Sequence, residues 1–163
     1  MASNVRYAVA GLALSAAGLA AITTYEGYRD TVYVPIPGDV PTAGYGHADI
    51  RLPVGKRIDK QQALKWLDED TKKAQEAIKR CVKVPLTQAE FDAYTSFTLN
   101  AGTAAFCNST LVKLLNQANY KAACDQLHRW VYSNGKKIKG LENRRNMETL
   151  TCTSGIYPKT DTQ

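Results

Sequence analysis

The sequence is poor in histidine, with only His47 and His128 in 163 residues, 81 positions apart. It contains no Gly-x-Ser-x-Gly turn and no Cys-His-Asn pattern, which argues against a hydrolytic triad. It also lacks a His-Glu-x-x-His motif, a His-x-His pair and an aspartate-rich calcium loop, so we expect no metal and no other cofactor. Any catalysis should therefore depend on carboxylates.

Internal repeats and low-complexity linkers are also absent. Apolar residues make up 44% of the chain and charged residues 22%, and a length of 163 residues suits one globular domain. The net charge of +6 comes mostly from residues 110–150, where eight basic residues oppose three acidic ones. These are mainly lysines at helical spacing without a nucleic-acid-binding signature. We therefore expect a solvated helical face, no nucleic acid partner and a monomer.

The N-terminal segment carries no charge over the 19 residues between Arg6 and Glu26. As a helix it would reach ~28 Å, close to the ~30 Å thickness of the hydrocarbon core of a membrane. Alanine and glycine dominate residues 7–22, so insertion should be marginal and reversible. We interpret residues 1–24 as a retained signal-anchor and residues 25–163 as the folded domain. A cleaved secretory signal and a buried N-terminal helix remain open alternatives.

The cysteines are too widely spaced for a Cys-x-x-Cys metal or redox motif. Four cysteines in an exported chain indicate two disulfides, for which three pairings are possible. We favour Cys81 with Cys107 and Cys124 with Cys152, because each pair lies at the ends of consecutive predicted helices that short loops would place side by side. Four buried thiols in a cytoplasmic protein are the alternative.

Apolar spacing after Asp59 is typical of helices. Asp59 is suited to cap the first of them, and residues 87–90 form a capping box for the next. Residues 27–57 instead predict short strands with a tight turn at residues 37–39. We therefore predict an α+β fold with one N-terminal helix, a small β-hairpin region and a mainly helical C-terminal part. The expected helices there cover residues 60–80, 87–102, 109–117, 120–132 and 141–151, with a loop at 133–140.

Among the carboxylates, Glu26 is distinctive because it follows the apolar segment and precedes Gly27. With apolar neighbours on one side, its carboxyl group should keep a proton near neutrality. Asp39 lies at the predicted turn, and a hairpin that folds back would bring it towards Glu26. Thr42 adds a hydroxyl that can hold a water. A protonated and an ionised carboxyl flanking a slot can cleave a glycosidic bond, although carboxylate pairs occur in any chain of this length.

The run Glu26-Gly27-Tyr28-Arg29, followed by Tyr33, Gly38 and the segment Thr42-Ala43-Gly44-Tyr45-Gly46-His47, resembles the signature of phage lysozymes of glycoside hydrolase family 24, the T4-lysozyme-like endolysins. Residues 97–102, 109–111, 123–130 and 140–145 are similar to later blocks of that family. The resemblance extends from about Tyr25 to Cys152. The alanine- and glycine-rich segment further resembles that of signal-anchor-release endolysins.

This resemblance implies a lysozyme-like fold and a muramidase that hydrolyses the β-1,4 bond between N-acetylmuramic acid and N-acetylglucosamine in peptidoglycan, causing host lysis. Glu26 matches the catalytic glutamate of the family, and Thr42 its threonine. Pro35 occupies the position where the family carries its aspartate, so we assign the second role to Asp39, with Asp30 as the fallback. Glu26 would protonate the leaving oxygen while Asp39 and Thr42 hold a water on the opposite sugar face, giving inversion.

The resemblance also implies supporting residues. Arg144 matches an arginine that approaches the catalytic glutamate. His47 is expected to orient the hairpin by hydrogen bonding within the substrate-binding region. Asn100, Ser109 and Thr110 would line the sugar groove, with helix capping as their alternative role.

The signal-anchor resemblance implies two states of the protein. In the first, residues 7–22 tether it to the host inner membrane, facing the periplasm. In the second, the protein is released into the periplasm. Two other functions stay open, a lytic transglycosylase on the same scaffold and a non-catalytic, membrane-anchored module that binds the cell wall.

Overall fold

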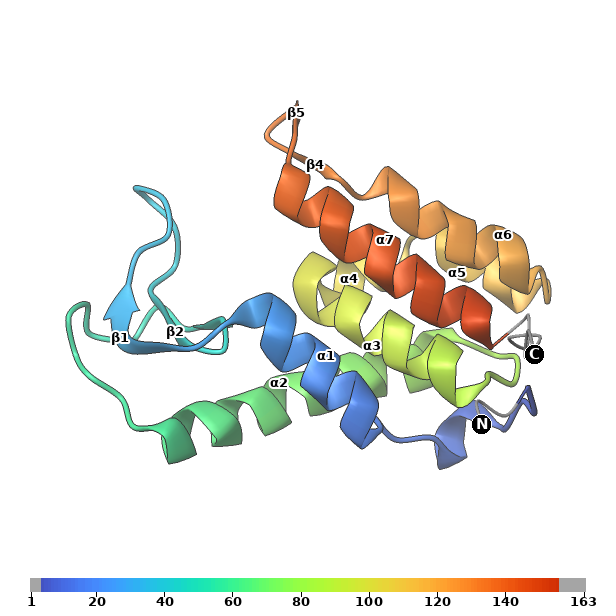
Figure 1. The fold of residues 1–163 in the computed structure, drawn as a ribbon, viewed down its shortest axis with the longest axis horizontal. Helices are drawn as coiled ribbons and strands as arrows, with labels where there is room; N and C mark the ends of the chain where they lie inside the picture. Colours follow the sequence, from blue (N-terminus) through green and yellow to red (C-terminus); the bar gives the residue numbers. More distant parts are fainter. Residues whose placement is uncertain (1–3, 156–163) are drawn as a thin grey trace, which may run out of the picture. The chain divides into compact units, whose positions relative to one another are not determined.

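The computed structural model describes residues 4–155 and has the predicted α+β fold (Figure 1). Helices dominate, and the strands are short. In chain order the elements are the 3₁₀ turn η1 (Val9–Gly11), α1 (Ala16–Glu26), β1 (Arg29–Tyr33), β2 (Thr42–Gly44), β3 (His47–Ala48), α2 (Lys60–Cys81), α3 (Gln88–Ala101), α4 (Thr103–Cys107), α5 (Thr110–Asn116), α6 (Tyr120–Asp125), the 3₁₀ turn η2 (Gln126–Arg129), β4 (Tyr132–Ser133), β5 (Lys136–Lys137) and α7 (Lys139–Ser154).

The described chain divides into two compact units. We call residues 20–72 the hairpin unit, and the described parts of residues 1–19 and 73–163 the helical unit. Both α1 and α2 have residues in each unit.

In the hairpin unit, the three strands form an antiparallel sheet in the order β1-β2-β3. Tyr33 of β1 pairs with Thr42 of β2, and Ala43 of β2 pairs with His47 of β3. Gly44 has a φ of +65°, and a Cβ atom there would lie 3.0 Å from Ala63 Cβ, so only glycine lets the sheet pack this closely on α2. The buried apolar residues of this unit include Ile22, Val32, Ala43, Ala63 and Leu67.

In the helical unit, α3 forms the centre of the core, because every residue from Glu90 to Thr98 is buried. The expected capping box is confirmed, with Thr87 and Glu90 each accepting a hydrogen bond from the other's backbone N–H. Helix α7 packs along α3 and α6. The cysteines form the two favoured disulfides, Cys81–Cys107 and Cys124–Cys152.

The start of the chain differs from the single apolar helix expected over residues 7–22. Tyr7 forms an antiparallel bridge with Leu86, and α1 begins only at Ala16. The reason is that side chains from later in the chain bind this backbone, since Gln75 accepts from the Leu14 N–H at 2.9 Å and Asp92 accepts from the Ser15 N–H at 3.0 Å. Among residues 4–155, no helix has both the length and the apolar character needed to cross a membrane.

The C-terminal half contains two further differences. The α-helix expected over residues 120–132 ends at Asp125, and the 3₁₀ turn η2 follows it directly. The loop expected over residues 133–140 contains part of the β4–β5 hairpin. Each strand of that hairpin has only two residues, too few to display an alternating pattern. Asp59 acts as predicted, because its carboxylate accepts from the Gln62 N–H at 2.7 Å where α2 begins.

Candidate active site

Glu26 is the last residue of α1 and is half-buried. Its carboxylate lies against the turn between β2 and β3, because a Cβ atom on Gly46 would lie only 2.8 Å from Glu26 Oε2. Gly46 also has a φ of +80°, which side-chain-bearing residues rarely adopt. Glycine at this position thus leaves the space in which the carboxylate sits.

The residue after Gly46 fixes this turn to α2. His47 Nδ1 lies 2.7 Å from Asp70 Oδ2, and the imidazole stacks on the indole of Trp66 with 4.5 Å between ring centroids. The His47 side chain is only 13% exposed, so it supports the turn, as the orienting role predicts. Sequence reasoning missed Asp70 and Trp66, although their spacing of four residues on a helix places them on one face.

Thr42 begins β2 and is buried. Its hydroxyl donates to the Val40 carbonyl at 3.0 Å. A hydroxyl that has donated its hydrogen keeps its lone pairs as acceptors. Thr42 Oγ1 can therefore accept a hydrogen bond from a water.

The two candidates for the second carboxylate have different surroundings. Asp39 is exposed in the loop between β1 and β2, where its N–H donates to the Ile36 carbonyl at 2.9 Å and closes the predicted turn. Asp30 lies in β1, and a hydrogen bond from Thr31, together with an ion pair to Arg57, lowers the pKa of its carboxyl. Asp30 is thus engaged by two side-chain partners, and Asp39 is exposed to solvent.

Arg144 belongs to a buried polar cluster in the helical unit. Its guanidinium donates to Glu148 Oε1 and to the Ser96 carbonyl, both at 3.0 Å. Arg145 donates to the other oxygen of Glu148 and to the side-chain oxygen of Asn100. Two arginines thus share one buried carboxylate, and Asn100, expected in the sugar groove, is held by Arg145.

The remaining predicted groove residues lie at the start of α5. Ser109 is the N-cap, because its hydroxyl accepts from the Val112 N–H at 3.2 Å, and it also donates to the Phe106 carbonyl at 2.7 Å. Ser109 is buried, so the capping role left open by the sequence is the one it performs. Thr110, the first residue of α5, is exposed.

Within the described part of the chain, no group of three or more histidine, cysteine, aspartate or glutamate side chains could hold a metal ion. The candidate site consists instead of carboxylates, a hydroxyl and a histidine. Glu26, at the end of α1, lies against Gly46 in the turn between β2 and β3, and His47 and Thr42 belong to the same hairpin.

Comparison with known proteins shows the family of the chain. The phage lysozyme family model matches residues 23–148. The SAR-endolysin of Escherichia phage Mu is 42% identical over 126 residues, which cover 76% of this chain and 68% of that protein. The endolysin of Bacillus phage B103 is 34% identical over 87% of this chain, but the match spans only 54% of that protein, about half its length. A solved structure, the endolysin from Escherichia coli O157:H7 phage FAHEc1, is 35% identical with a TM-score of 0.79, covering 95% of this chain and 100% of that chain. The chain belongs to the phage lysozyme family.

Proposed function

We propose that this protein is a phage endolysin that hydrolyses the β-1,4 bond between N-acetylmuramic acid and N-acetylglucosamine in bacterial peptidoglycan. The observation that carries the proposal is the Glu26 carboxylate seated against Gly46, on a hairpin that also carries the acceptor oxygen of Thr42. Membership of the phage lysozyme family supports the same reaction.

In the proposed mechanism, Glu26 acts as the general acid and protonates the leaving glycosidic oxygen. Asp39 and Thr42 hold a water on the opposite face of the sugar, and its attack inverts the anomeric centre. Room for that water requires carboxyl groups about 6.5–9.5 Å apart in the substrate complex. His47 supports the turn beside Glu26, and Arg144 keeps a supporting electrostatic role.

The proposal also assigns binding roles to polar residues of the helical unit. Asn100 and Thr110 are exposed and can hydrogen-bond to sugar hydroxyl or acetamido groups. Ser109 contributes by fixing the start of α5, where Thr110 lies.

Replacement of Glu26 by Gln tests the catalytic assignment. The variant should fold normally and release no fragments from purified peptidoglycan. Asp39→Asn and Asp30→Asn, measured side by side, identify the second carboxylate, and only the first should abolish turnover. Mass spectrometry of the fragments separates hydrolysis from transglycosylation, because only a transglycosylase leaves anhydro-muramoyl ends. Parental activity in Glu26→Gln would refute the assignment.

We further propose that residues 7–22 first anchor the protein in the host inner membrane, facing the periplasm, and that it is later released. The uncharged sequence between Arg6 and Glu26 supports this, as does the name SAR-endolysin of the phage Mu relative. The proposed anchor is residues 1–24, and the catalytic domain is residues 25–163. In the released protein the segment is retained rather than cleaved, because residues 16–25 form the part of α1 that leads to Glu26.

The folded state has contacts that could drive release. Arg6 binds both carboxylate oxygens of the fully buried Glu90, at 2.7 and 3.2 Å, and its guanidinium lies 3.6 Å above the Tyr120 ring. Val9 and Leu12 are buried in the core of the helical unit. A membrane-inserted segment would forgo these contacts and leave Glu90 without this cation, so they favour the released form.

A further inference from the structure

The β4–β5 hairpin and the residues after it carry a dense group of cations. Residues 132–139, which we call the cationic hairpin, include Lys136, Lys137 and Lys139 and no acidic residue. Three of the five lysines of residues 110–150 thus lie within four positions. The sequence predicts these lysines on a solvated helical face, but only Lys139 lies on a helix, as the first residue of α7.

The cationic hairpin projects from the helical unit. Every residue over 132–140 is exposed, and Figure 1 shows β4 and β5 extending beyond the first turn of α7. Tyr132 pairs with Lys137, and the turn between the strands contains Asn134 and Gly135, both with positive φ. A two-residue turn of this kind matches the twist of the paired strands. The hairpin can therefore present its tip to a flat partner.

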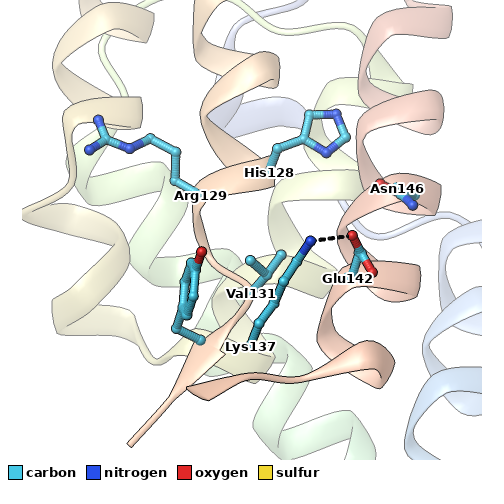
Figure 2. Close-up of a pocket in the computed structure, with 7 residues that line it drawn as sticks. His128, Arg129, Val131, Lys137, Glu142 and Asn146 are labelled. Atoms are coloured by element: carbon cyan, nitrogen blue, oxygen red, sulfur yellow. Dashed lines mark hydrogen bonds and ion pairs between the residues drawn. The ribbon is translucent and has the colours of Figure 1, made fainter. Parts of the chain in front are cut away.

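One carboxylate neutralises part of the positive charge. Glu142 of α7 accepts from Lys137 Nζ at 2.6 Å, as Figure 2 shows, and from Lys139 Nζ at 3.0 Å. Both lysines still face water, because their side chains are 53% and 78% exposed. Lys136 forms no hydrogen bond or ion pair with any residue of the range 4–155. Three cations against one anion leave this surface positively charged.

Two large apolar side chains are exposed among these cations. Tyr132 is 62% exposed and Ile138 is 40% exposed. A nucleic acid or free phosphate would pair with the lysines but leave both apolar side chains in water. The interface of an anionic bilayer satisfies both kinds of group, since tyrosine is favoured at headgroup level and lysine is attracted to the negative surface. The mixture of side chains thus fits a lipid surface better than a purely polar anion.

We propose that the cationic hairpin binds the surface of a bilayer that contains anionic phospholipids. Its three lysines bind the headgroup phosphates, and Tyr132 and Ile138 enter the interface. The contact is weak and reversible, because a few cations and two apolar side chains contribute little beside a spanning helix. None of these residues belongs to the proposed anchor at residues 7–22. The hairpin therefore holds the protein near a membrane surface after that anchor has left it.

Co-sedimentation of the full chain with lipid vesicles tests the inference. Vesicles of phosphatidylcholine mixed with phosphatidylglycerol should bind the parent more tightly than vesicles of phosphatidylcholine alone. The double variant Lys136→Gln, Lys139→Gln removes two cations and keeps the pair between Lys137 and Glu142. Each cation near an anionic surface contributes about fivefold to partitioning, so the double variant should bind the mixed vesicles about 25-fold more weakly at low salt. Residues 7–22 are unchanged, so binding through them is common to both proteins.

Matched controls separate the hairpin from general charge and hydrophobicity. The double variant Lys79→Gln, Lys113→Gln removes two exposed cations elsewhere in the helical unit and should bind like the parent. Tyr132→Ser removes an apolar contact, so its loss of binding should persist at high salt, which screens the lysines. Leu150→Ser is its control, because Leu150 is 63% exposed, and this variant should also bind like the parent.

Four results would overturn the inference. They are a parent protein without preference for anionic vesicles, unchanged binding in the Lys136→Gln, Lys139→Gln variant, equal losses in the control variants, and binding to isolated peptidoglycan that falls by the same factor in that variant. The last result would assign the hairpin to anionic groups of the wall. The proposed hydrolysis is tested separately, because Glu26→Gln should bind vesicles like the parent. A parent that fails to cleave peptidoglycan leaves the vesicle results unaffected.

Discussion

The carboxylate of Glu26 and the α-carbon of Gly46 are so close that a methyl group on residue 46 would lie 2.8 Å from Glu26 Oε2. The proposed acid therefore lies directly against the backbone of residue 46. Its position depends on the turn between β2 and β3, which His47 ties to α2.

Gly46→Ala should impair catalysis far more than folding. The added methyl group displaces the carboxylate, and misplacement of a catalytic group by about 1 Å can cost 100-fold in rate. Gly55→Ala is the matched control, because Gly55 has a similar φ of +85° but open space around its α-carbon. Both variants should lose about 1–2 kcal/mol of stability from the backbone conformation. Lysis rates and thermal melts check this, and equal activity in the two variants would contradict it.

Asp70→Asn should weaken the hairpin unit by removing the charged partner of His47. A hydrogen bond to a charged group in a largely buried site contributes about 1.5–3 kcal/mol to the free energy of unfolding. Asp68→Asn is the control, since Asp68 forms a solvent-exposed i,i+4 pair with Lys72 that should contribute about 0.5 kcal/mol at most. Urea unfolding of both variants makes the comparison, and similar losses would show that Asp70 does not hold the turn.

Arg6→Gln should destabilise the folded protein because it leaves the carboxylate of Glu90 buried without its cation. We expect a loss on the order of 2–3 kcal/mol, reduced from that of a fully buried pair because Arg6 is partly exposed. The double variant Arg6→Gln, Glu90→Gln should recover part of this loss. A double-mutant cycle of unfolding free energies measures the coupling, and additive losses would indicate that the pair contributes nothing.

Leucine at Ala16, Ala17 and Ala20 should trap the protein in the membrane. All three side chains are exposed in the folded state, so leucine there raises the hydrophobicity of the segment without filling the core. Gly18 is unsuitable for this test, because a Cβ atom on it would lie 2.8 Å from Asp92 Cγ. Membrane fractionation and lysis timing report retention, and serine at the same three positions is the control. Lysis at the parental time with leucine would count against the anchor.

Stability should depend on Glu142 in a pH-dependent way. Its pKa in the folded protein is lowered from 4.5 to about 2, mainly by the hydrogen bond from Lys137 and then by that from Lys139. Because the folded pKa is the lower one, the stabilisation is fully present above the unfolded value and disappears as the pH falls towards about 2. The Glu142→Gln variant should therefore have a lower melting temperature than the parent at pH 7. Near pH 2 the two proteins should melt at the same temperature. Glu76→Gln, at an exposed glutamate of α2, should show no such trend.

Features set by local sequence could be predicted, and those set by distant partners could not. The Thr87–Glu90 capping box and the long helices α2, α3 and α7 follow from neighbouring residues. Both disulfides follow from the order of these helices. The N-terminal segment resembles one continuous helix in the sequence because it carries no charge between Arg6 and Glu26. Its backbone partner Asp92 lies 77 residues away from Ser15.

In the candidate site, too, contacts with residues distant in the sequence could not be predicted. The family signature predicts Glu26 and Thr42 as catalytic residues, and His47 as the residue that orients the hairpin. Its partners Asp70 and Trp66 lie on α2, beyond the hairpin, and become visible only when α2 packs against the turn. The β4–β5 hairpin has strands of only two residues each, too short to predict from an alternating pattern.

Both disulfides cross-link the helical unit, closing segments of 26 and 28 residues, and no cysteine lies in the hairpin unit. Each such link contributes about 3 kcal/mol by restricting the unfolded chain, and two of them amount to much of the 5–15 kcal/mol margin of a typical domain. Newly made chains in a reducing cytosol would lack both links. The helical unit would therefore lack this share of its stability until both bonds have formed.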